Sequence, residues 1–156
     1  MLFRSGLLNI TRENSGPFQL GTVNLCRARF SGLQLGAVNI TQTAAFSQIG
    51  LYNHSQLNRG LQIGIANITE GGSFGFQIGV GNKALLMRGF QIGAYNETRG
   101  VCRGLQIGAI NQAGVARGLQ IGIINYARQL RGVQIGLFNL SMKNGLPFFP
   151  GINIGF

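Results

Sequence analysis

Acidic residues are nearly absent from this chain. It contains no aspartate, and its three glutamates, Glu13, Glu70 and Glu97, stand against 13 lysines and arginines, which gives a net charge of +10. Only 10% of the residues are charged, tryptophan is missing, and 26 residues are glycine. A chain so rich in glycine and so poor in lysine and glutamate is not expected to be mainly helical. Its charge favours anionic partners such as nucleic acid, lipid headgroups or acidic glycans.

Residues that carry catalysis or bind metals are also scarce. His54 is the single histidine, and we expect it to be a variable turn residue. The two cysteines, Cys26 and Cys102, fit neither a Cys-x-x-Cys motif nor a Cys/His metal spacing. No nucleophile has a neighbouring base in the sequence, so we predict a protein that is not an enzyme and that has no metal site and no cofactor.

Long apolar runs are missing as well. Residues 1–10 lack an apolar segment long enough for a signal peptide, and no small-residue cleavage site follows them. No uninterrupted apolar run approaches the roughly 20 residues of a membrane-spanning helix. No export signal is therefore visible in this sequence.

A tandem repeat of 14 to 15 residues occupies most of the chain. Each copy is built on Gly-apolar-Gln-Ile/Leu-Gly-x-x-Asn, and successive copies of its second glycine lie 14 or 15 residues apart until a last step of 19. Such regularity is typical of repeat architectures. The ten glycines are Gly6, Gly21, Gly36, Gly50, Gly64, Gly79, Gly93, Gly108, Gly122 and Gly136, with a partial match at Gly155.

Two amide columns accompany these glycines. Glutamine stands two residues before each glycine, except for Arg4 and Asn153 in the terminal copies, and asparagine stands three residues after each of the ten. Side chains that recur at one phase are predicted to stack as ladders. The Gln column is Gln19, Gln34, Gln48, Gln62, Gln77, Gln91, Gln106, Gln120 and Gln134; the Asn column is Asn9, Asn24, Asn39, Asn53, Asn67, Asn82, Asn96, Asn111, Asn125 and Asn139.

The repeat predicts strands. In residues 118–125, Leu119, Ile121 and Ile123 fall on one side of a period-2 pattern and Gln120 falls on the other. An all-β, single-domain β-solenoid of about ten coils and an outer-membrane up-and-down β-barrel both fit this spacing. Identical Gln and Asn in every copy favour the solenoid, because its coils stack in register about 4.8 Å apart. Asparagine is expected at a coil corner, and glutamine on an exposed strand face.

The chain divides into a repeat solenoid over residues 1–141 and a C-terminal capping segment with a partial repeat over residues 142–156. The last step inserts Pro147 and Pro150, which cannot donate ladder hydrogen bonds, around Phe148 and Phe149. We expect these phenylalanines to cover the open end of the core. An open solenoid end exposes unpaired strand edges, so we expect self-association through any end that is not capped.

These units resemble a family of bacterial surface-repeat proteins whose copies read Gly-Val/Leu-Gln-Ile-Gly-Leu-x-Asn and which end in a Pro- and Phe-rich segment. The matching stretches are 60–67, 89–96, 104–111, 118–125 and 132–139, together with 146–156. The Gln-x-Gly-x-x-Asn core is also similar to the repeats of curlin-type amyloid subunits. The family resemblance implies a protein of the cell surface, the outer membrane or the secreted fraction, and it carries no catalytic residues.

An arginine that recurs in half of the copies is the candidate binding residue. The residue before the first motif glycine is arginine in five copies, with Phe74 filling the gap: Arg59, Arg88, Arg103, Arg117 and Arg131. Stacked one per coil, these side chains would form a cationic stripe whose spacing matches the charges of a polyanion. The alternative is that the arginines only form a solvated, charged face that binds nothing specific. We expect a non-enzymatic structural or interaction protein that binds polyanions or other proteins. The alternatives are an outer-membrane barrel and a self-assembling, amyloid-like fibre subunit.

Overall fold

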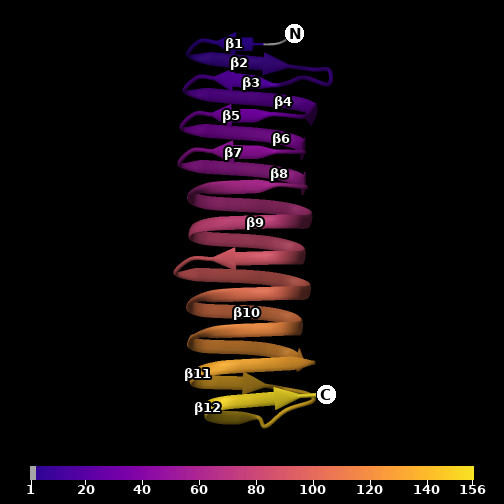
Figure 1. Cartoon of the computed structure of the whole chain (residues 1–156), viewed down its shortest axis with the longest axis vertical. Coiled ribbons are helices and arrows are strands. Elements are labelled where there is room, and N and C mark those ends of the chain that lie inside the picture. Colours follow the sequence, from indigo (N-terminus) through magenta and orange to yellow (C-terminus); the bar gives the residue numbers. More distant parts are fainter. Residues whose placement is uncertain (1–2) are drawn as a thin grey trace.

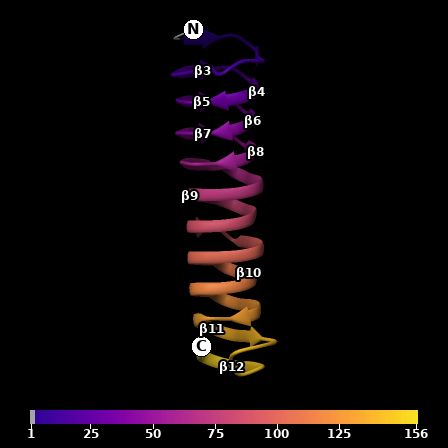
Figure 2. The same ribbon diagram turned by 90° about the vertical axis from the view of Figure 1, so that its right-hand side faces the viewer.

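The chain forms a single all-β solenoid of about ten coils in a computed structural model that describes residues 3–156. Figure 1 shows the chain winding as a flattened coil along one axis, and Figure 2 shows the coil edge-on. The predicted fold class is therefore confirmed. No helix long and apolar enough to cross a membrane occurs among the described residues.

Each coil contains two strand segments. We call the segment that contains the Gln position the motif strand and the segment that contains the Asn position, which begins one residue before it, the Asn strand. In the first coils they are separate elements, whereas β9 and β10 each run through more than two coils without a break. The strands are β1 (Phe3–Ser5), β2 (Leu8–Thr11), β3 (Phe18–Leu20), β4 (Val23–Phe30), β5 (Leu33–Leu35), β6 (Val38–Ala44), β7 (Ser47–Ile49), β8 (Tyr52–Asn58), β9 (Leu61–Ile92), β10 (Tyr95–Leu130), β11 (Gly132–Ser141) and β12 (Phe148–Gly155).

Neighbouring coils pair in parallel and in register. Gln120 lies opposite Gln134, and Asn125 lies opposite Asn139. The same pairing relates β3 to β5, β5 to β7, β4 to β6 and β6 to β8. The barrel alternative is wrong, because consecutive strands of an up-and-down barrel are antiparallel.

Amide side chains fill the interior. Gln106 and Asn111 are both 0% exposed, and the other ladder glutamines and asparagines are buried as well. The expectation that the Gln column lies on an exposed face is therefore wrong. Because side chains alternate across a strand, a buried glutamine directs the apolar residues on either side of it to the outer surface.

The Asn ladder satisfies its own amides. Asn96 Nδ2 donates to Asn111 Oδ1 of the next coil at 2.9 Å and also to the backbone oxygen of Ile107 at 2.9 Å. Equivalent paired bonds are made from Asn24 and from Asn53. Each asparagine thus ties one coil to the next through both a side chain and the backbone at the corner.

The Gln ladder runs in the opposite direction. Gln106 Nε2 donates to Gln91 Oε1 of the preceding coil at 2.7 Å, and Gln120 repeats the bond to Gln106 at 2.7 Å. Hydroxyls of the Asn strand support the ladder, since Thr98 Oγ1 donates to Gln91 Oε1 at 3.0 Å. Buried amides cost little when they are paired in this way.

Small residues complete the core. Ala113, Ala116 and Ala127 pack with Cys102 and with the two larger side chains Met87 and Leu130. These side chains occupy the two inward positions of the Asn strand that the asparagine does not fill. The apolar part of the interior is therefore a narrow cluster beside the ladders.

Glycine at the second motif position leaves room for the ladder. A Cβ atom on Gly108 would lie 2.0 Å from the backbone oxygen of Gly93 and 2.7 Å from Asn96 Nδ2. The first motif glycine lies at the opposite corner of the coil. There Gly104 has a φ of 143°, a backbone angle that residues with a side chain rarely adopt. The path of the coil thus requires glycine at the second position, whereas the first position also accepts Pro17 and Phe46.

The C-terminal segment closes the solenoid by an unexpected route. β12 pairs with β11 in the antiparallel direction, and Asn153 takes the next place in the Gln ladder by donating to Gln134 Oε1 at 3.3 Å. Phe148 and Phe149 remain 52% and 42% exposed, so the expectation that they cover the core is wrong. Phe148 instead stacks on Phe138 at the outer surface. Pairing of the last edge by a reversed strand prevents the ladder from continuing.

Candidate functional site

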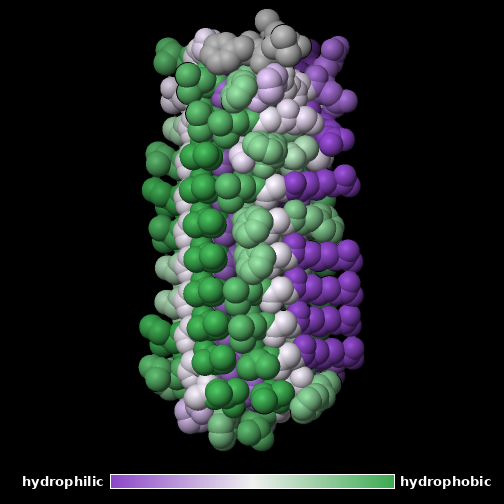
Figure 3. Space-filling model, viewed as in Figure 1, coloured by the Kyte–Doolittle hydropathy of each residue, from purple (hydrophilic) through white to green (hydrophobic). Residues whose placement is uncertain are grey.

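The five arginines of the sequence motif form one column, which we call the arginine stripe (Arg59, Arg88, Arg103, Arg117 and Arg131). Arg103 lies directly opposite Arg88 in adjacent coils, which places them about 4.8 Å apart along the backbone. The stripe appears as a purple edge along one side of the molecule in Figure 3. Four of the five are exposed, and Arg117 is half-buried.

Few contacts hold these guanidinium groups. Phe74 takes the place of arginine in the coil between Arg59 and Arg88. The Arg88 Cζ atom lies 5.5 Å from the centroid of the Phe74 ring, which is a cation–π contact. Arg117 Nε is the one buried side-chain nitrogen or oxygen in the described part of the chain that has no hydrogen-bond partner. None of the ion pairs among the described residues involves the stripe. Like charges one coil apart repel each other, and counterions or an anionic partner would relieve that repulsion.

The outer surface of the motif strands adjoins the stripe. We call it the motif face. Its side chains flank the buried glutamines, and Ser47 is the one polar residue among them: Phe18, Leu20, Leu33, Leu35, Ser47, Ile49, Leu61, Ile63, Phe76, Ile78, Phe90, Ile92, Leu105, Ile107, Leu119, Ile121, Val133 and Ile135. Figure 3 shows these columns as green ridges that run the length of the molecule. A monomeric soluble protein rarely exposes so continuous an apolar surface.

A straight groove follows one margin of the motif face. Its volume is about 530 Å³, and Gly50, Gly64, Gly79 and Gly93 form its floor. Ile63 stands on one wall and Ile65 on the other. Ile63 and Ile65 face outward on either side of Gly64, whose added Cβ would point inward at Asn53 Nδ2, so the glycine column forms the floor of an apolar channel.

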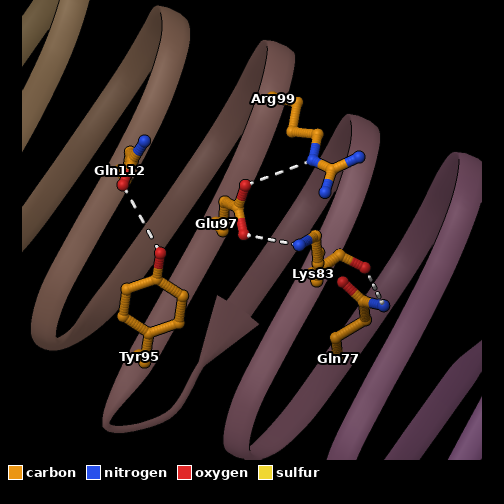
Figure 4. A network of polar contacts seen from close by, with 6 residues as sticks. All are labelled: Gln77, Lys83, Tyr95, Glu97, Arg99 and Gln112. Atoms are coloured by element: carbon orange, nitrogen blue, oxygen red, sulfur yellow. Dashed lines mark hydrogen bonds and ion pairs between the residues drawn. The ribbon is translucent and has the colours of Figure 1, made fainter.

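The opposite surface, formed by the Asn strands, is mixed. Glu97 accepts from Lys83 at 3.1 Å and from Arg99 at 3.3 Å, while Tyr95 donates to Gln112 at 3.4 Å (Figure 4). Burial, and secondarily the nearby Glu97 carboxylate, raise the pKa of Tyr95. Glu97 is therefore engaged away from the stripe.

His54 and Glu70 form a second pair on that surface, at 3.1 Å. His54 lies within β8, opposite Ile40 and Ile68, so the expectation of a turn residue is wrong. The described residues include no group of three His, Cys, Asp or Glu side chains that would hold a metal ion.

The cysteines are unlike reactive thiols. Cys26 and Cys102 are both free and buried. Burial raises the pKa of Cys102 to about 11, against a smaller opposing effect of its hydrogen bond with Thr98. A thiol that is protonated and enclosed is a poor nucleophile.

Comparison of the chain with protein-family models, with curated proteins and with solved structures gives no match. The candidate site therefore depends on geometry alone. The arginine stripe was identified from the sequence. The motif face was not, although its signal was present: once the Gln column is placed inside, the alternation of each motif strand turns Leu119 and Ile121 outward.

Proposed function

We propose that this protein is a non-enzymatic interaction protein that binds polyanions along its arginine stripe, in a bacterial surface or secreted setting. The setting follows from the resemblance of its repeats to bacterial surface-repeat proteins. The binding rests on one observation: arginines recur along one edge of a rigid solenoid at the spacing of its coils, and none of the ion pairs among residues 3–156 involves them.

The rigidity of the solenoid supports binding. Each coil is fixed to the next by ladder bonds of 2.7 to 2.9 Å, such as those of Gln106 and Asn96, so the backbone spacing of the arginines is set in advance. Guanidinium groups bind phosphate, sulfate and carboxylate oxygens through paired donors. A preorganised row of such groups favours an extended anion over a compact one.

Binding of heparin and of single-stranded nucleic acid at increasing salt tests the proposal. Affinity is expected to fall linearly on a log–log plot, and the double variant Arg103→Ser/Arg117→Ser is expected to lower that slope by about 1 to 2. The matched control, Arg27→Ser/Arg128→Ser, removes the same charge at exposed positions outside the stripe and should change the slope little. Equal effects of the two variants would mean that net charge alone attracts the polyanion.

A fibre subunit is the second candidate function, and the stacked Gln and Asn ladders favour it, since identical amide ladders also stabilise cross-β assemblies. Growth of thioflavin-positive fibres by the full chain, with loss of polyanion binding in the assembled form, would replace the first proposal with this one.

A further inference from the structure

The motif face and the arginine stripe lie side by side along the whole length of the stripe. Arg103 and Leu105 project on either side of the corner glycine Gly104, and the same arrangement recurs at Arg117 and Leu119. A soluble polyanion would neutralise the stripe but would leave the motif face in water. A partner that satisfies both must offer an apolar phase bordered by negative charge.

We infer that the motif face is a docking surface for an anionic lipid bilayer, with the apolar ridges at the acyl boundary and the stripe among the phosphates. This inference rests on the proposed function, because it names the polyanion that the stripe binds. Interfacial amphipathic helices bind in the same manner, with an apolar side in the interface and basic residues beside it. Each basic residue near such a surface adds electrostatic attraction to the anionic headgroups.

Charge argues against a second copy of this chain as the occupant. Two copies packed motif face to motif face would keep Glu70 and Glu97 apart from the stripes, because both project from the Asn strands and already pair with His54, Lys83 and Arg99. Such a dimer would cover the apolar ridges and leave both stripes without counter-charge. An anionic membrane supplies both requirements at once.

The shape of the motif face also suits a lipid surface. Phe76 and Phe90 stack at 5.1 Å between centroids in adjacent coils, which places an aromatic pair within an otherwise mainly aliphatic ridge. The groove above Gly64 and Gly79 runs parallel to this ridge and is apolar on both walls. Long arginine side chains at the margin of the face can extend toward the headgroups while the ridges remain in the interface.

Vesicle sedimentation with matched variants provides the test. The full chain should sediment with vesicles of equimolar phosphatidylcholine and phosphatidylglycerol, and should stay in solution with phosphatidylcholine alone. Ile107→Thr/Ile121→Thr weakens the motif face and should reduce vesicle binding about tenfold while heparin binding is unchanged. The control Ile110→Thr/Ile124→Thr alters the outer side of the Asn strands in the same two coils and should bind vesicles like the unaltered chain.

A fluorescent reporter gives an independent readout, since the chain has no tryptophan of its own. With anionic vesicles, Ile121→Trp should shift its emission to the blue and be quenched by brominated lipid, whereas Ile124→Trp should not. Equal quenching at the two positions would overturn the orientation and the inference with it.

Other outcomes separate this inference from the proposed function. Binding to heparin without binding to anionic vesicles would overturn the lipid surface and leave the polyanion site in place. Absence of both would overturn both. A stable dimer in sedimentation velocity that ignores vesicles would assign the motif face to a second copy.

Discussion

Asn96 donates to Asn111 across adjacent coils at 2.9 Å, and both side chains are wholly buried. This bond belongs to a ladder that continues at the same phase from Asn9 to Asn139. Most β-proteins bury apolar side chains and expose amides. Here the amides hold the coils together from inside, and apolar ridges face outward.

The two ladders should contribute similarly to stability. Asn111→Ala and Gln106→Ala each remove a buried amide and leave its neighbours in the ladder unpaired, so each should lower the free energy of unfolding by about 2 to 4 kcal/mol in urea. Gln56, which is exposed, is the control, and its replacement by alanine should change stability by less than about 0.5 kcal/mol. A Gln106 variant as stable as the Gln56 variant would contradict a buried Gln ladder.

Gly108→Ala tests the coupling between the corner glycine and the Asn ladder. The added Cβ would meet Gly93 O at 2.0 Å and Asn96 Nδ2 at 2.7 Å, so we expect a loss of about 2 kcal/mol or more in thermal or urea unfolding. Gly81→Ala is the matched control because nothing lies within 4 Å of its added Cβ. It should be neutral or stabilising by up to about 1 kcal/mol. Equal losses of stability in the two variants would mean that the cost arises from restricting the glycine backbone, and not from the lack of space for a Cβ atom at Gly108.

Cys102 should resist alkylation in the folded protein. Its pKa of about 11 lies above that of an ordinary thiol, 9.0, so it stays protonated at pH 8 and reacts only when the chain unfolds. The folded state holds this proton more tightly than the unfolded state. Stability should therefore decline as pH rises from about 9 to about 11, and Cys102→Ala should reduce that decline. Rapid labelling of Cys102 at pH 8 under native conditions would contradict its burial.

No disulfide should join Cys26 to Cys102. About five coils separate them, or roughly 24 Å, whereas a disulfide needs Cα atoms within about 7 Å. Mass spectrometry of the oxidised, proteolysed monomer should find no peptide pair linked by these residues. Such a pair would be incompatible with the order of the coils.

Removal of residues 145–156 should cause oligomerisation. The deletion exposes the parallel edge of β11 and the end of the Gln ladder at Gln134, which β12 covers through Asn153. Light scattering should show oligomers for the truncated chain and a smaller species for the full chain. A truncated chain with the scattering of the full chain would show that β12 is not a cap.

The sequence was sufficient to predict the solenoid, its repeat length and its ladders, because Asn111 and Gln106 recur at one phase in almost every copy. It was not sufficient to predict which side of the motif strand faces inward. Alternation places Gln120 and Ile121 on opposite sides but does not say which is inside, and ordinary hydrophobic reasoning favours burying isoleucine. The cooperative pairing of amides along the whole ladder is what turns the glutamines inward. This pairing exists only in the stack of coils and cannot be seen in a single copy of the repeat.

Thiol accessibility at neighbouring positions of one motif strand tests this inverted arrangement most directly. Gln91 is 0% exposed and Ile92 is 38% exposed, while the native cysteines are buried and give a low background. In folded protein, verified by circular dichroism, Ile92→Cys should react quickly with a maleimide and Gln91→Cys should be protected until the chain is denatured. Fast labelling at position 91 with protection at position 92 would contradict an amide interior and an apolar outer face.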